Sequence, residues 1–233
     1  MPFLPVWDLN PLKRVRFQYV TASLIAINTA VYFLLQSDLV FHVPPGFTQG
    51  LALLPRYVLP LQALLQHIPG LYRLVTYMFL HANVLHLLFN MIFLFVFGDN
   101  VEDAMGHARF ILFYSICGVA AGLVHCALTG APDLPLIGAS GAVSGVIGAY
   151  LLLHPNIRVW VLVPLPKLPV VPLRFSAALV IGVWIFYQFG SAMLLPSTDT
   201  AWWAHVGGFL TGAFLVILMR RRGVPLFDAA TGI

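Results

Sequence analysis

Six apolar stretches dominate this sequence, and the charges, prolines and polar clusters fall mainly between them. The stretches cover residues 17–36, 83–99, 109–128, 140–154, 175–194 and 201–219. A membrane-spanning helix needs about 20 largely apolar residues. Only 9% of the 233 residues are charged and 60% are hydrophobic, which leaves too few charges to cover a water-soluble surface. We therefore expect an all-α membrane protein whose six transmembrane helices form one domain over residues 1–233.

The basic residues predict how these helices are oriented. If the N-terminus is cytoplasmic, every one of the 12 Lys and Arg residues except Arg56 and Arg73 falls on the cytoplasmic side. Such an excess is typical of cytoplasmic loops, so we expect both termini in the cytoplasm. Because this bias accounts for the positive net charge, no nucleic-acid partner is expected.

Two connecting segments are unusual. Residues 37–82 form the first outer loop, and within it residues 50–75 are apolar but interrupted by prolines. This pattern predicts an element that is embedded in the outer leaflet of the membrane instead of crossing it. Residues 155–172 contain five prolines and predict an irregular, partly interfacial linker on the cytoplasmic side.

The fourth stretch is too short to cross a bilayer. From Ser140 to the residue before Pro155 it forms about 22 Å of helix, whereas the hydrocarbon core is about 30 Å thick. Its start therefore lies below the outer surface. Non-helical backbone at that depth is tolerated only where protein or a water-filled cavity satisfies it. We expect Ser140 at the bottom of a cavity that is open to the outside.

Small residues predict which helices approach closely. Gly141, Gly145 and Ala149 recur along the fourth stretch, and the sixth carries Gly208 and Gly212 on the face of its histidine. Small residues at this spacing let membrane helices come into near backbone contact. This contact would bring the histidine of the sixth stretch close to the serine of the fourth.

That arrangement predicts nucleophilic catalysis. A serine hydroxyl becomes a nucleophile beside a general base such as the neutral imidazole of His205. Ser140 begins a helix, so its free N–H could stabilise an oxyanion, and the Asn90 amide and the His86 ring could supply further donors. The fourth to sixth stretches contain no acid, and Asp133 and Asp199 lie in outer loops. A Ser–His dyad is therefore favoured over a triad.

With these motifs, the sequence resembles the rhomboid intramembrane serine proteases. The matching motifs are Gly138-Ala139-Ser140-Gly141, His81-x4-His86-x3-Asn90 and Ala204-His205-Val206-Gly207-Gly208, in the family's order and on the corresponding stretches. The resemblance covers most of residues 17–219. It implies a six-helix bundle that cleaves transmembrane segments of other membrane proteins among membrane lipids, without a cofactor or metal. It assigns these roles: Ser140 as nucleophile, His205 as general base and acid, Asn90, His86 and the Ser140 N–H as oxyanion hole, and His81 as structural.

The resemblance also has departures. Tyr72-Arg73 stands where the family has a Trp-Arg pair in the first outer loop, and Ser144 stands where some members place an aromatic ring under the catalytic histidine. For Ser144 a packing role is favoured. Glu102 and Gly106 fit a family pattern that we interpret as structural.

Two non-enzymatic alternatives remain. One is a catalytically inactive relative that binds transmembrane clients, which the complete set of motif residues disfavours. The other is a small transporter, which lacks the expected repeat symmetry and charged residues in the late stretches. By analogy with compact family members, we expect the plasma membrane of a prokaryote.

Overall fold

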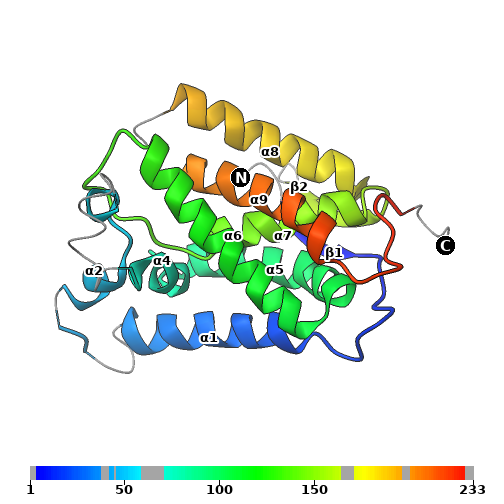
Figure 1. Cartoon of the computed structure of the whole chain (residues 1–233), viewed down its shortest axis with the longest axis horizontal. Coiled ribbons are helices and arrows are strands. Elements are labelled where there is room, and N and C mark those ends of the chain that lie inside the picture. Colours follow the sequence, from blue (N-terminus) through cyan, green and yellow to red (C-terminus); the bar gives the residue numbers. More distant parts are fainter. Residues whose placement is uncertain are drawn as a thin grey trace.

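The computed structural model describes residues 4–37, 42–44, 46–58, 71–163, 171–195 and 200–228. Within these ranges the chain is mostly helical (Figure 1). Six apolar helices correspond to the predicted stretches: α1 (Tyr19–Leu35), α5 (Val84–Met105), α6 (His107–Leu128), α7 (Ser140–Leu153), α8 (Ala177–Leu194) and α9 (Trp202–Met219). Of these, α5, α6, α8 and α9 are long and apolar enough to cross a membrane, whereas α1 and α7 are shorter. That all six helices cross the membrane therefore stays a prediction.

Helix α7 occupies the centre of the bundle and packs against α5, α6 and α9, while α1 and α8 lie at opposite edges (Figure 1). The predicted close contact between the fourth and sixth stretches is confirmed. A Cβ atom built on Gly208 would overlap the carbonyl oxygen of Gly141, and one built on Gly212 would overlap that of Gly145. The two backbones therefore touch, and no side chain larger than hydrogen fits between them.

Helix α5 extends beyond its predicted end at residue 99 because two buried carboxylates find partners there. Glu102 accepts hydrogen bonds from the backbone N–H groups of Val20 (3.0 Å) and Thr21 (2.8 Å). These groups belong to the first turn of α1, which has no side-chain cap of its own. Asp103 accepts from the N–H groups of Arg14 and Val15, both at 2.6 Å. Glu102 thus has a structural role, as expected, and anchors α1.

A small sheet contradicts the expectation of an irregular linker over residues 155–172 and of an all-α chain. Strands β1 (Leu4–Asp8), β2 (Arg158–Val163) and β3 (Val171–Ser176) form an antiparallel sheet in the order β1-β2-β3. The central strand is rich in valine, which favours extended structure. The prolines within the sheet fall on the two edge strands, where a missing N–H is tolerated.

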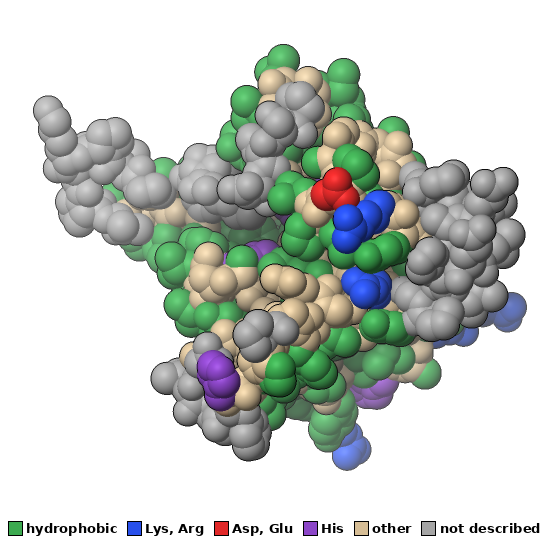
Figure 2. Space-filling view, turned by 90° about the vertical axis from the view of Figure 1, so that its left-hand side faces the viewer, with side chains coloured by type: hydrophobic (Ala, Val, Ile, Leu, Met, Phe, Trp, Pro, Cys, Tyr) green, Lys and Arg blue, Asp and Glu red, His purple; other side chains and the backbone are tan. Residues whose placement is uncertain are grey.

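The outer loop is held against the segment that precedes α7. It contains α2 (Phe47–Leu51), η1 (Pro55–Tyr57), α4 (Arg73–Thr76) and η3 (Tyr77–Phe79). The Arg73 guanidinium donates to the carbonyl of Ala52 (3.0 Å), and Leu53 forms a backbone bridge with Leu136. Figure 2 views this end of the molecule, where a few charged side chains lie on a largely hydrophobic surface. The prolines at 60 and 69 of the predicted membrane-embedded element lie outside the described residues.

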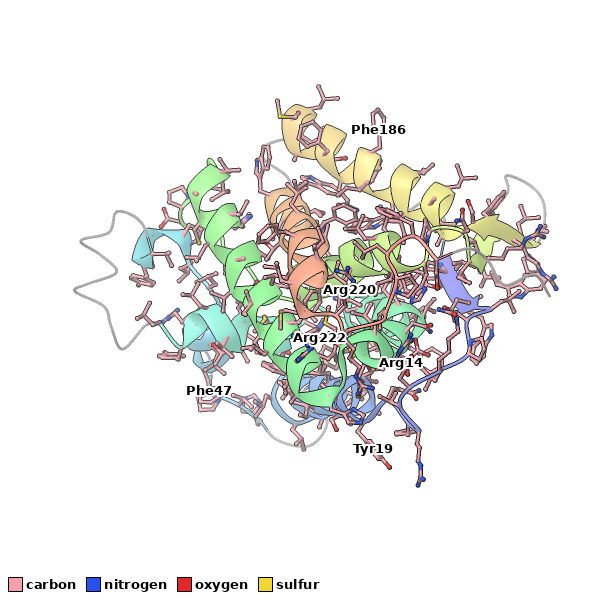
Figure 3. The ribbon with its side chains drawn as sticks, turned by 45° about the vertical axis from the view of Figure 1, so that its right-hand side comes forward. Arg14, Tyr19, Phe47, Phe186, Arg220 and Arg222 are labelled. Carbon is pink, nitrogen blue, oxygen red and sulfur yellow. The ribbon has the colours of Figure 1, made fainter. Side chains whose placement is uncertain are left out.

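Basic residues from distant parts of the sequence meet at the end of α5. Arg14 lies 3.8 Å from Asp103, and the backbone N–H of Arg221 donates to the carbonyl of Ala104. Figure 3 shows Arg14, Arg220 and Arg222 near one another. In the same view Phe186 of α8, which is 81% exposed, points away from the bundle. A membrane-spanning helix bundle is expected to have basic residues at one membrane face and apolar side chains toward lipid, and this arrangement fits that expectation. The orientation of the termini nevertheless stays a prediction.

The segment after α9 caps the C-terminus of helix α7, which ends at Leu153. The N–H groups of Phe227 and Asp228 donate to the carbonyls of Leu152 (2.7 Å) and Leu153 (3.0 Å). The Asp228 carboxylate also lies 2.8 Å from Nδ1 of His154. These contacts satisfy carbonyls that a helix C-terminus otherwise leaves free.

A buried carboxyl group connects the sheet to the core. Oδ2 of Asp8 accepts a hydrogen bond from the Tyr150 hydroxyl at 2.5 Å, and Asn100 also lies within reach. Burial raises the pKa of Asp8 to about 7, and the nearby Asp99 acts in the same direction. The folded protein therefore holds this proton up to near-neutral pH.

Replacing Asp8 with asparagine is expected to remove one source of pH-dependent stability. The unfolded chain releases this proton near pH 4, whereas the folded protein keeps it to about pH 7. The free energy of unfolding of the wild type therefore decreases as the pH rises from about 4 to about 7, by up to roughly 4 kcal/mol. The asparagine variant, which has no proton to release, lacks this decrease. Melting temperatures of both proteins in detergent, measured from pH 4 to pH 8, check this. A difference between them that is the same at every pH would contradict it.

Candidate active site

Ser140 stands at the start of α7, and a constrained turn places it there. The preceding Gly138 has φ +120°, a conformation that side chains other than hydrogen rarely adopt, and its N–H donates to the carbonyl of Tyr77 at 2.9 Å. A Cβ atom on Gly138 would also lie 2.8 Å from Cε1 of His86. Glycine is therefore required at residue 138 both for the turn and for the approach of the imidazole.

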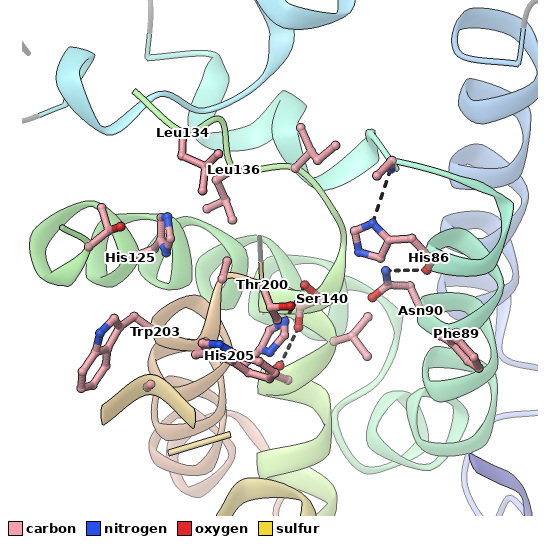
Figure 4. Close-up of a pocket in the computed structure, with 18 of the residues that line it drawn as sticks. His86, Phe89, Asn90, His125, Leu134, Leu136, Ser140, Thr200, Trp203 and His205 are labelled. Carbon is pink, nitrogen blue, oxygen red and sulfur yellow. Dashed lines mark hydrogen bonds between the residues drawn. The ribbon is translucent and has the colours of Figure 1, made fainter. Parts of the chain in front are cut away.

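His205 meets Ser140 across the contact between α7 and α9. Its Nε2 lies 2.9 Å from the Ser140 Oγ (Figure 4). His205 lies in the first turn of α9 and is 7% exposed. The absence of larger side chains between the two helices permits this distance, because the residues on their facing surfaces are glycines. The structure thus brings together the two residues of the predicted dyad.

A third residue that the sequence analysis missed touches the histidine. Oε1 of Gln188, which is completely buried on α8, lies 2.7 Å from Nδ1 of His205. An acid is the usual third member of such a site, and the apolar stretch 175–194 contains no acid but one amide, Gln188. Burying a lone amide in such a helix is energetically costly, and this cost is the sequence signal that points to a functional contact.

Aromatic rings flank His205 from two other helices. The centroids of Trp184 on α8 and Trp202 on α9 both lie 6.2 Å from that of the imidazole. These rings supply the aromatic support that a serine at residue 144 cannot give. The Ser144 hydroxyl instead donates to the carbonyl of Ser140 at 2.6 Å, as serines packed in helices often do.

The three residues predicted to supply oxyanion donors, His86, Asn90 and Ser140, line one cavity. Nδ1 of His86 accepts from the N–H of Ala82 at 3.4 Å, so its Nε2 carries the proton. A Cβ atom on Gly138 would lie 2.9 Å from that Nε2 and 3.7 Å from the Ser140 Oγ, which shows that both face the same space. As the first residue of α7, Ser140 has an N–H without an intrahelical acceptor.

Asn90 lies one turn from His86 on α5. Its Nδ2 donates one hydrogen to the His86 carbonyl at 2.9 Å, which leaves a second hydrogen for a ligand (Figure 4). His81, by contrast, is buried with its ring edge against His86. Burial lowers the pKa of His81 to about 3, and the nearby His86 adds to this effect, so the ring is neutral. Its position is consistent with the structural role that the resemblance implies.

Ser140, His205, His86 and Asn90 line a cavity of about 670 Å³. Its wall combines the polar groups above with apolar side chains, among them Phe89, Phe93, Val143, Ile147 and Trp184. A mainly apolar cavity with a few converging polar groups is the usual form of a binding site. In the described part of the chain, no three His, Cys, Asp or Glu side chains are placed to hold a metal ion.

Comparisons with known proteins find relatives of this chain. A family model described as Rhomboid domain matches residues 69–222. RHOMBOID-like protein 5 of Arabidopsis thaliana is 34% identical over 151 residues, which are 64% of this chain and 45% of that protein. RHOMBOID-like protein 6, mitochondrial, of the same plant is 31% identical over 155 residues, 65% of this chain and 46% of that protein. YdcA of Bacillus subtilis (strain 168), whose name includes the words rhomboid protease, is 40% identical over 82 residues, 35% and 41% of the two chains. The matches thus span less than half the length of these relatives.

Proposed function

This chain belongs to the rhomboid family, and from that premise we propose that it is an intramembrane serine endopeptidase that cleaves transmembrane segments of other membrane proteins. The observation that carries the proposal is the 2.9 Å contact between the Ser140 Oγ and Nε2 of His205 inside a cavity. A serine and a neutral imidazole in hydrogen-bond contact form the minimal unit for acyl transfer.

The proposed reaction uses groups of this chain alone. Nε2 of His205 takes the proton from Ser140 as Oγ attacks the carbonyl carbon of a peptide bond. The resulting oxyanion accepts hydrogen bonds from the Ser140 N–H, Nε2 of His86 and Nδ2 of Asn90. His205 then gives its proton to the leaving amine. Water, deprotonated by the same imidazole, attacks the ester carbonyl, and His205 then returns that proton to the Ser140 Oγ as the acid product leaves.

The cavity suits a substrate segment that has lost helical structure. A continuous helix ties its carbonyls in hydrogen bonds, so a bond can be cut only where the segment unwinds. The apolar wall offers contacts to apolar side chains, and the polar groups beside Ser140 offer partners to the freed backbone. Transmembrane proteins and lipids are the partners that this proposal requires.

Cleavage of a model transmembrane substrate in proteoliposomes tests the function. Wild type is expected to release two fragments, and Ser140→Ala is expected to slow cleavage by at least about a thousandfold, because the nucleophile is lost. Ser144→Ala is the matched control, one turn away on α7, and is expected to keep a rate within about threefold of wild type. If folded wild type binds the substrate without cutting it, the client-binding alternative replaces this proposal.

The membrane that holds the protein is a separate question. The apolar helices and the family make this chain a membrane protein. The relatives do not favour a prokaryotic plasma membrane, since one is a plant protein named mitochondrial and another is bacterial. The prokaryotic location with both termini in the cytoplasm stays a prediction.

A further inference from the structure

Gln188 is a buried polar residue that does not contribute to stability in any evident way. It is completely buried on α8, among apolar neighbours. Within the described part of the chain its Nε2 has no hydrogen-bond partner, so only half of the amide is satisfied. An unsatisfied buried donor lowers stability, and an apolar side chain of the same length would avoid that cost. The residue therefore needs another explanation.

The contact that Gln188 does make lies on the catalytic histidine. Its Oε1 is 2.7 Å from Nδ1 of His205, while Nε2 of the same ring is 2.9 Å from the Ser140 Oγ. A carbonyl oxygen only accepts, so Nδ1 must carry the hydrogen. In a neutral imidazole the lone pair then lies on Nε2, the atom that faces Ser140. The opposite tautomer could not take the serine proton.

We infer that Gln188 is a positioning residue that holds His205 in its reactive tautomer, an inference that rests on the proposed function. The same bond persists when the imidazole becomes charged during the reaction, because the imidazolium still donates from Nδ1 to Oε1. Gln188 thus takes the place that a buried carboxylate occupies in a Ser-His-Asp triad.

An amide suits this site better than a carboxylate would. Gln188 lies on an apolar helix that is long enough to cross a membrane, where a buried charge is expensive. An amide offers an acceptor of the same reach without that charge. Trp184 and Trp202 flank the imidazole and limit its tilt, while Gln188 determines which nitrogen carries the hydrogen.

Two substitutions of nearly equal size separate this role from packing. Methionine at 188 keeps the length and removes the acceptor, whereas glutamate keeps an oxygen without hydrogen facing Nδ1. Gln188→Met is expected to slow fluorophosphonate labelling of Ser140 roughly tenfold to a hundredfold, with a melting temperature equal to or above that of wild type. Gln188→Glu is expected to recover most of the labelling rate while melting at a lower temperature.

Packing alone would give the reverse order, with the less stable glutamate variant the less active one. Steady-state cleavage is expected to show the methionine effect in kcat with little change in KM. The control is Ser191→Ala, a buried substitution one turn further along α8, which should label like wild type. If wild type is active and Gln188→Met labels within twofold of it, the inference is overturned and the proposed function stands. If wild type neither labels nor cleaves, both fall.

Discussion

His205→Ala is expected to slow labelling of Ser140 by a fluorophosphonate probe by at least about a thousandfold, without unfolding the protein. The probe reacts with a serine only when a base removes its proton, and in the described structure Nε2 of His205 is the ring nitrogen bonded to that hydroxyl. The small alanine leaves a void beside Trp184 and Trp202, so some loss of stability accompanies the loss of reactivity.

His125→Ala provides the matched comparison, because His125 on α6 also lines the cavity and is similarly buried. Its labelling rate is expected to stay within a few fold of wild type. Rates are measured by in-gel fluorescence over time, with melting temperatures recorded for each variant. Labelling of His205→Ala at the wild-type rate would show that Ser140 does not depend on this imidazole, and the dyad would have to be abandoned.

Gly212→Ala is expected to destabilise the whole bundle by about 3 kcal/mol and to lower the melting temperature by roughly 10 °C. A single methyl group at this position would overlap the Gly145 backbone, which cannot move without displacing α7. The same displacement would separate Ser140 from His205, so labelling should fall together with stability.

The buried thiols report this directly. Cys117 and Cys126 are buried in the folded protein, so their alkylation during heating follows opening of the bundle. Gly182→Ala is the control, since a Cβ atom there meets nothing within 4 Å, and alanine favours helix over glycine. Thiols of Gly212→Ala that stay protected up to the wild-type temperature would contradict the close-packing argument.

Much of the helical framework could be predicted because the membrane simplifies the pattern. The long apolar runs and the spacing of Gly208 and Gly212 carry their meaning locally, so the helices and the α7–α9 contact follow from the sequence. The approach of Ser140 and His205 is a direct result of that contact.

The features that were missed depend on partners far away in the chain. The helical residues beyond 99 in α5 are stabilised by N–H groups of the segment before α1 and of its first turn, which no local pattern reveals. The prolines of residues 155–172 argued against strands, although a sheet tolerates proline on an edge strand. Which strand becomes an edge depends on the pairing of the whole sheet and cannot be read locally. Gln188 was missed because its role depends on a single hydrogen bond to His205 of α9, which the sequence does not reveal.

The pairing of β1 with β2 also has a consequence for the order of folding. Residues 4–8 pair with residues 159–162, so four of the apolar helices are synthesised between the two strands. Synthesis proceeds from the N-terminus, and a strand cannot pair before its partner exists. Strand β1 therefore stays unpaired until β2, which follows α7, has been synthesised. Sheet closure is a late step, and it joins the oldest part of the chain to the strand pair that leads directly into α8.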